Sequence, residues 1–136
     1  MPVFCHSVWV ACPVDVAFDV VADVKTHPRW QSGLVEAGAG FEVRRVLGRA
    51  VRFDYEITDF ERPNQWGFRA LNGPVRPSAV LSFRTEGAGT RISSKMTIPG
   101  FQGWLVGGMM LRQQKRNYKQ LKKLLESGAL SKESRG

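Results

Sequence analysis

Apolar and polar residues alternate along most of the chain with a period of two, which is typical of half-buried β-strands. The clearest run alternates Val51, Phe53, Tyr55 and Ile57 with Arg52, Asp54, Glu56 and Thr58. Similar runs predict strands at residues 4–10, 41–46, 66–70, 79–83 and 92–98, and residues 31–37 form a shorter candidate. The connections contain Gly, Pro and Asn and have hairpin lengths, so the pattern predicts an antiparallel sheet of six to seven strands.

Two segments depart from this alternation and predict helices. Residues 13–26 place apolar side chains at helical spacing, and Pro13 suits the first helical position. Because Pro28 disfavours helical geometry in the residue before it, we expect the first helix to end before His27. Residues 101–127 predict one long helix. This order of elements predicts a curved sheet wrapped around the final helix, with room for a ligand between them.

The final helix has two chemically different faces. One face carries Met110, Leu111, Gln114, Asn117, Tyr118, Leu121, Leu124 and Leu125. The other carries Arg112, Lys115, Arg116, Lys119, Lys122 and Lys123. Gln114 and Asn117 interrupt the apolar face, and an unpaired buried amide costs about 1–3 kcal/mol. These two side chains therefore either bond to the sheet or line a space that holds water or a ligand.

Length and composition indicate an ordinary globular domain over residues 1–127, followed by a polar tail at 128–136 that we expect to be disordered. No apolar run reaches the roughly 18 residues of a membrane span, and the N-terminus lacks the features of a signal peptide. A cytoplasmic location is expected, with Cys5 and Cys12 reduced. The net charge of +8 is uneven, because residues 101–136 carry 8 basic and 2 acidic side chains. This favours anionic partners at the last helix.

Several segments, in this order and spacing, match a known family. They are VWVACPVDVAF (8–18), HPRW (27–30), ITDFERP (57–63), GAGTRI (87–92) and NYKQLKKLLE (117–126). Over roughly residues 3–127 the chain resembles the START-like superfamily, also called SRPBCC or Bet v 1-like, which includes polyketide cyclase/dehydrase-like proteins. The resemblance implies an α+β helix-grip fold with short helices after the first strand. It also implies a cavity for hydrophobic or amphipathic molecules such as lipids, sterols or polyketides, but no shared catalytic residue.

We expect the cavity to be lined by residues from the sheet, the first turn and the last helix. The candidates are Trp30, Arg45, Phe53, Tyr55, Phe68, Met96, Met110, Gln114, Asn117 and Tyr118. Trp30 either caps the core or forms a cavity wall. Arg45 points inward if its strand is regular, where it could meet a ligand carboxylate, whereas a bulge or a position near the end of the strand is the alternative. For Tyr55, Met96 and Met110, packing in the hydrophobic core is an alternative to lining a cavity.

A catalytic constellation is not identifiable from the sequence. The inward set offers His6, which fits a core histidine, but it offers no carboxylate, because Asp54 and Glu56 have the outward phase. His27 is expected to be exposed in its turn, with a position at the mouth of the pocket as the alternative. No nucleophile, phosphate-loop or metal-ligand motif is present, so no metal or cofactor is expected and the catalytic residues stay unassigned.

The sequence therefore predicts a carrier, sensor or sequestering protein that binds a hydrophobic or amphipathic small molecule. The alternative is a cyclase, aromatase or dehydratase acting on a polyketide-like substrate, since holding a reactive chain in a productive shape can itself accelerate a reaction. A second alternative is a protein-interaction module that uses the basic helix. Transient contact of that helix with an anionic membrane is a further expectation, and nucleic acid is disfavoured because the aromatic residues follow the core phase. No oligomeric state follows from the sequence.

Overall fold

The computed structural model describes residues 3–31, 33–46, 48–73, 76–100 and 102–127. Within these residues, seven strands form one antiparallel sheet in the order β1-β7-β6-β5-β4-β3-β2. The strands are β1 (Val3–Val10), β2 (Leu34–Gly38), β3 (Phe41–Val46), β4 (Arg49–Glu61), β5 (Gln65–Ala70), β6 (Ser78–Glu86) and β7 (Gly89–Thr97). The predicted antiparallel sheet is confirmed, at the upper end of the expected strand number. The predicted tail at 128–136 lies outside the described residues.

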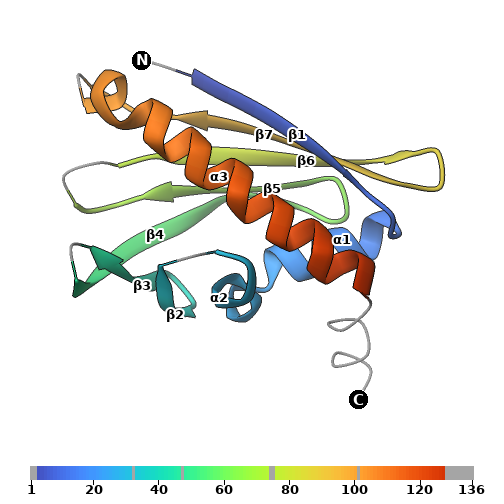
Figure 1. The fold of residues 1–136 in the computed structure, drawn as a ribbon, viewed down its shortest axis with the longest axis horizontal. Coiled ribbons are helices and arrows are strands. Elements are labelled where there is room, and N and C mark those ends of the chain that lie inside the picture. Colours follow the sequence, from blue (N-terminus) through green and yellow to red (C-terminus); the bar gives the residue numbers. More distant parts are fainter. Residues whose placement is uncertain (1–2, 32, 47, 74–75, 101, 128–136) are drawn as a thin grey trace.

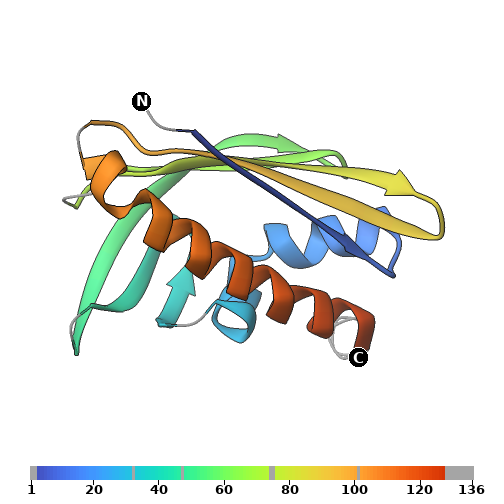
Figure 2. The same ribbon diagram turned by 45° about the horizontal axis from the view of Figure 1, so that its top comes forward.

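The helices lie on one side of this sheet. Between β1 and β2 come α1 (Val14–Ala22), the 3-10 helix η1 (Val24–Thr26) and α2 (His27–Trp30), and α3 (Gln102–Ser127) closes the described chain. Figure 1 shows α3 crossing the sheet diagonally, and Figure 2 shows α1, α2 and α3 on the same side of it. The sheet therefore curls around the last helix, which confirms the helix-grip prediction.

Two local details differ from the predictions. Pro13 is the N-cap of α1, with an extended ψ of 151°, rather than its first helical residue. His27 is helical, with φ −55° and ψ −41°, although Pro28 follows it. The buried His27 ring makes a 2.7 Å hydrogen bond to the Val21 carbonyl, and the His27 carbonyl accepts from the Gln31 amide. These tertiary and capping bonds override the local preference of a residue before proline.

The strand β4 produces the curvature. One half of this 13-residue strand pairs with β3 and the other half with β5, and its register shifts between Ile57 and Asp59. A bulge of this kind bends a strand and increases its twist. Figure 2 shows β4 bending away from the plane of β6 and β7. The β2–β3 end of the sheet is thus brought round toward the helices.

The strand register aligns side chains in rows across the concave face. Phe68 of β5 pairs with Ala79 of β6, and Ala79 pairs with Met96 of β7. In the next row, Trp66 pairs with Leu81, and Leu81 pairs with Ser94. Since directly paired residues share a face of the sheet, these two rows form one surface beneath α3.

The C-terminal half of α3 contributes to the same buried hydrophobic core as the sheet and α1. Leu121 and Phe18 are fully buried, and the rings of Phe18 and Phe83 meet edge to face at 5.3 Å. The end of the helix is also bonded to the end of β1, because Lys122 Nζ donates to the Trp9 carbonyl at 2.7 Å and Glu126 accepts from the Ala11 amide at 2.8 Å. The space between the sheet and the C-terminal half of α3 is therefore filled by side chains, and any open space lies nearer the middle of α3.

Candidate ligand-binding cavity

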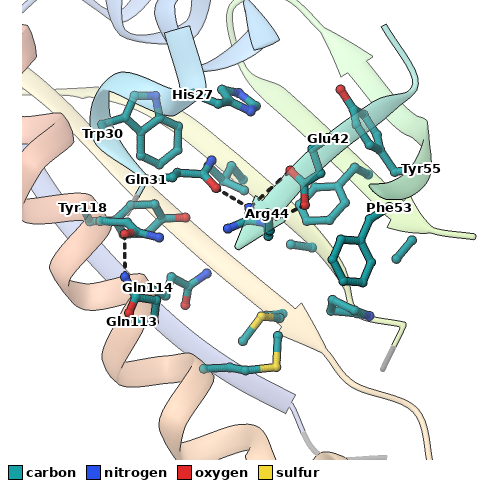
Figure 3. Close-up of a pocket in the computed structure, with 18 of the residues that line it drawn as sticks. His27, Trp30, Gln31, Glu42, Arg44, Phe53, Tyr55, Gln113, Gln114 and Tyr118 are labelled. Atoms are coloured by element: carbon teal, nitrogen blue, oxygen red, sulfur yellow. Dashed lines mark hydrogen bonds and ion pairs between the residues drawn. The ribbon is translucent and has the colours of Figure 1, made fainter. Parts of the chain in front are cut away.

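A cavity of about 380 Å³ lies between the concave face of the sheet and α3. Pockets for small molecules commonly measure about 300–1,000 Å³, so this space is large enough for a modest organic ligand. Its floor consists of five residues of the two rows described above, and its walls come from α2, β3, β4 and α3. The floor residues are Trp66, Phe68, Ala79, Leu81 and Met96. Figure 3 shows the side chains that surround it.

Aromatic rings make up much of the lining. Phe53 and Tyr55 extend from β4, and Tyr55 meets Phe68 edge to face at 6.2 Å. The ring centres of Trp66 and Phe68 lie 5.7 Å apart. The Tyr55 hydroxyl donates to the Gly38 carbonyl at 3.0 Å, so its polar end is already satisfied by the fold. This part of the lining can contact apolar or aromatic surface and offers little hydrogen bonding.

The helix α2 contributes two buried rings, His27 and Trp30, each 5% exposed. The His27 ring lies edge to face with Trp30 at 5.3 Å and with Trp66 at 5.7 Å. Its Nε2 bonds to the Val21 carbonyl, which can only accept, so Nε2 carries the proton and Nδ1 keeps its lone pair. Burial lowers the pKa of His27, so the imidazole is neutral at neutral pH. The expectation that His27 is exposed is wrong.

The wall formed by α3 is polar in its middle. Gln114 Nε2 donates to the Ser94 hydroxyl of β7 at 2.8 Å, and Gln113 Nε2 donates to Asn117 Oδ1 at 3.0 Å. Burial raises the pKa of the Tyr118 hydroxyl to about 12, although hydrogen bonds with Ser94 and Gln114 lower it. The Tyr118 phenol is therefore neutral. The sequence left open whether the inner amides bond to the sheet or line a cavity. Gln114 does both, because it bonds to Ser94 of the sheet and lines the cavity.

Three charged or amide side chains form a polar cluster on the β3 side, which we call the Arg44 cluster: Gln31, Glu42 and Arg44. Arg44 Nε and Nη2 bond to the two carboxylate oxygens of Glu42 at 2.7 and 3.2 Å. Arg44 Nη2 also donates to Gln31 Oε1 at 2.5 Å. Figure 3 shows the cluster between Trp30 and Tyr118 on one side and Phe53 and Tyr55 on the other. It therefore gives an otherwise aromatic space one strongly polar region.

Buried polar atoms without a protein partner are concentrated around this cavity. Among the described residues, the buried side-chain atoms that lack a hydrogen bond are Trp30 Nε1, Trp66 Nε1 and Gln114 Oε1. All three residues line the cavity. Since native proteins leave few buried polar groups unpaired, their location makes the cavity the least satisfied part of the interior.

Residues 1–126 match the family model described as polyketide cyclase / dehydrase and lipid transport. The chain belongs to this family. Its resemblance to START-like proteins is thereby confirmed, and the family is associated with binding of hydrophobic ligands or with polyketide cyclisation. No curated protein matches the chain.

Solved structures show the same fold at low sequence identity. A START superfamily protein from Mycobacterium smegmatis has a TM-score of 0.73 and 14% identity, over 92% of this chain and 97% of that one. A protein from Deinococcus radiodurans has a TM-score of 0.73 and 18% identity, over 93% of this chain and 99% of that one. The di-domain ARO/CYC BexL from the BE-7585A biosynthetic pathway has a TM-score of 0.73 and 16% identity, over 90% of this chain and 46% of that one.

Nine of the ten predicted cavity residues line the cavity of this family member. They are Trp30, Phe53, Tyr55, Phe68, Met96, Met110, Gln114, Asn117 and Tyr118. His6 is half-buried beside them and stacks on Tyr118 at 5.4 Å.

Arg45 is the exception, since it is exposed and does not line the cavity. Phe41 and Val43 are apolar and share the phase of Arg45, a pattern that favours the inward face for all three. Instead, Val43 pairs with Arg52, and the Arg52 guanidinium lies 4.5 Å from the centre of the Phe41 ring on the same face. Glu42 pairs with Phe53, which lines the cavity, so Glu42 and Arg44 point inward and Arg45 lies on the opposite face.

The sequence reasoning therefore missed the residues that carry most of the cavity's polarity: His27, Gln31, Glu42, Arg44 and Gln113. The statement that no carboxylate points inward is wrong, because Glu42 does. One signal in the sequence could have indicated the pair, since Glu42 and Arg44 have opposite charges two residues apart on a predicted strand and so share one face. Asp54 also borders the cavity, although its carboxylate bonds to Arg52 at 3.1 Å.

In the described part of the chain, no group of three or more His, Cys, Asp and Glu side chains is placed to hold a metal ion. None of the helices described is long and apolar enough to span a membrane.

Proposed function

We propose that this protein binds an amphipathic small molecule in its internal cavity and acts as a carrier, sensor or sequestering protein. The observation that carries the proposal is the cavity of about 380 Å³ between the sheet and α3. Interiors are normally close-packed, with few voids larger than a water molecule, so a space of this size needs a reason. Membership of the polyketide cyclase / dehydrase and lipid transport family supports a small-molecule ligand.

The lining supports an amphipathic rather than a purely aliphatic ligand. Rings such as Phe53, Phe68 and Trp66 offer apolar and aromatic contact. Asn117 on one wall and Arg44 on the other offer hydrogen bonds. Since ligand sites typically combine an apolar lining with a few placed polar groups, this composition fits a molecule with an apolar body and a few polar substituents.

The direct test is native mass spectrometry of the purified protein, followed by solvent extraction of any bound molecule. We expect a mass above that of the chain, and recovery of an unmodified amphipathic compound. A neutral fluorescent probe such as N-phenylnaphthylamine should also bind saturably and be displaced by the extracted compound. If no compound is recovered and no neutral aromatic probe binds saturably, the proposal is wrong.

A second candidate function is cyclisation or dehydration of a polyketide-like substrate. The observation that favours it is a neutral imidazole at the cavity wall, since His27 has an unprotonated Nδ1 and interacts electrostatically with Glu42 and Arg44. A base of this kind can accept a proton from carbon next to a carbonyl group. Incubation with a poly-β-carbonyl thioester should then give a cyclised product faster than buffer alone. His27→Gln should abolish this rate while retaining probe binding, and an unchanged rate would exclude the role of His27.

The outer face of α3 supports a proposal about partners. Arg112, Lys115, Arg116, Lys119 and Lys123 are exposed there, and Met109 on the same helix is 64% exposed. We propose that this face makes transient contact with an anionic membrane surface, from which an amphipathic ligand could be loaded. The proposal includes a cytoplasmic location, which the unpaired Cys5 and Cys12 support because thiols persist in reducing compartments.

A further inference from the structure

The lining of the cavity does not share the positive charge of the protein. The chain carries a net charge of +8. Among the described residues that line the cavity, the charged side chains are Glu42, Arg44 and Asp54; Glu42 is paired with Arg44, and Asp54 is paired with Arg52 outside the lining. The described residues of the lining therefore include no cation without an anionic partner. The exposed lysines and arginines of α3 do not indicate the charge of the ligand.

The geometry of the Arg44 cluster shows how its single positive charge is used. The guanidinium fork engages both carboxylate oxygens of Glu42, at 2.7 and 3.2 Å. The two side chains are only 30% and 22% exposed, so water screens them less than it screens a surface pair. Within the described part of the chain, Arg44 Nη1 makes no hydrogen bond. Arg44 can therefore still donate hydrogen bonds into the cavity, but its charge is already balanced.

We propose that the cavity selects electroneutral ligands that carry a carbonyl or hydroxyl group, and that Glu42 is the residue that excludes carboxylates. This inference rests on the proposed function, because it specifies the ligand of the same cavity. A carbonyl oxygen can accept a hydrogen bond from Arg44 without changing the balance of charge. A ligand carboxylate would place a second negative charge beside Glu42 in a region partly removed from water, where repulsion is strong.

The remaining polar groups of the lining agree with a neutral ligand. The imidazole of His27 is uncharged, and burial keeps the Tyr118 phenol uncharged as well. Gln113, Gln114 and Asn117 contribute amides, which donate and accept hydrogen bonds without charge. These groups can recognise hydroxyl and carbonyl substituents, and none of them compensates a ligand anion.

The experiment uses two probes that share one naphthalene ring and one substitution position, methyl naphthyl ketone and naphthoate. Dissociation constants are measured by calorimetry at neutral pH, where naphthoate is ionised. In the unaltered protein, we expect the ketone to bind at least about tenfold more tightly, a modest value for one uncompensated charge at this depth. Equal affinities, or tighter binding of naphthoate, would overturn the inference.

The decisive variant is Glu42→Gln, which keeps the size of the side chain and leaves the charge of Arg44 unmatched. We expect the ratio of the affinity for naphthoate to the affinity for the ketone to rise at least about tenfold. The matched control is Glu56→Gln, which removes a carboxylate paired with Arg69 on β4 and β5, away from the cavity lining. This control should leave both affinities unchanged. A folded Glu42→Gln protein that still rejects naphthoate overturns the inference.

A second variant keeps the inference testable if Glu42→Gln does not fold. Arg44→Gln removes the hydrogen-bond donor and leaves the carboxylate of Glu42. This variant should bind the ketone more weakly and should continue to exclude naphthoate. A gain in naphthoate affinity in Arg44→Gln contradicts the inference. Failure of both probes to bind every folded form contradicts the proposed function itself, whereas equal binding of the two probes contradicts only the selectivity.

Discussion

The substitution Ala79→Leu tests whether the space beneath α3 is a real cavity. Ala79 lies on β6, is 4% exposed and lines the cavity. Its cross-strand partners are Phe68 and Met96, which line the cavity on either side of it. A leucine at this position extends three further carbon atoms from the floor of the cavity. In a close-packed interior the same atoms would collide with their neighbours.

The magnitude follows from the burial of those three carbons. At about 0.8 kcal/mol for each buried CH₂ group, burial contributes at most about 2.4 kcal/mol. Ordering a leucine side chain costs about 0.5–1 kcal/mol, so the free energy of unfolding should rise by about 1.5 kcal/mol. Without a cavity, overpacking should instead lower the free energy of unfolding by about 1–3 kcal/mol. The sign of the change in the free energy of unfolding therefore distinguishes an open cavity from a close-packed interior.

The assay is equilibrium unfolding in urea, followed by tryptophan fluorescence and by circular dichroism to check that the transition is two-state. The matched control is Ala17→Leu, because Ala17 is fully buried in the core and does not line the cavity. Ala17→Leu should be destabilised, whereas Ala79→Leu should be stabilised and should bind a neutral aromatic probe more weakly. If Ala79→Leu loses as much stability as Ala17→Leu, the reasoning about the cavity is wrong.

The parts of the fold that the sequence predicted are those that depend on local periodicity. Alternation at 51–57 predicted β4, and helical spacing placed Tyr118 and Leu121 on the face of α3 that is buried. Burying one face of an element imposes a period on its own residues, so the sequence carries this information without reference to the rest of the chain. The elements and the buried face of α3 were predictable for this reason.

The polar half of the cavity was not predictable in the same way. The side of the sheet that each residue of β3 faces is fixed by the pairing of Glu42 with Phe53, which lies on another strand. On both faces of β3, the residues whose burial is described are half-buried or exposed. The apolar Phe41 therefore does not indicate which face of the strand points into the cavity. His27 was misjudged because its burial and its bond to Val21 depend on how α2 packs, and not on the adjacent proline.

Two further predictions concern the basic helix and the buried histidine. The double substitution Lys115→Ala with Lys119→Ala should weaken binding to phosphatidylserine vesicles, measured by sedimentation, about 30-fold, since each basic residue near an anionic surface contributes about 1 kcal/mol. Lys95→Gln, at an exposed position of β7, is the control, and equal binding to uncharged vesicles would contradict the proposed contact. Burial lowers the pKa of His27, so the unfolded chain takes up this proton more readily than the folded protein and stability should fall as pH drops below about 6.5. In His27→Gln the free energy of unfolding should therefore depend less on pH between neutrality and mild acid, whereas His6→Gln, at a half-buried site whose pKa is also lowered, should have a smaller effect. An unchanged pH dependence in His27→Gln would mean that this imidazole is not held neutral by burial.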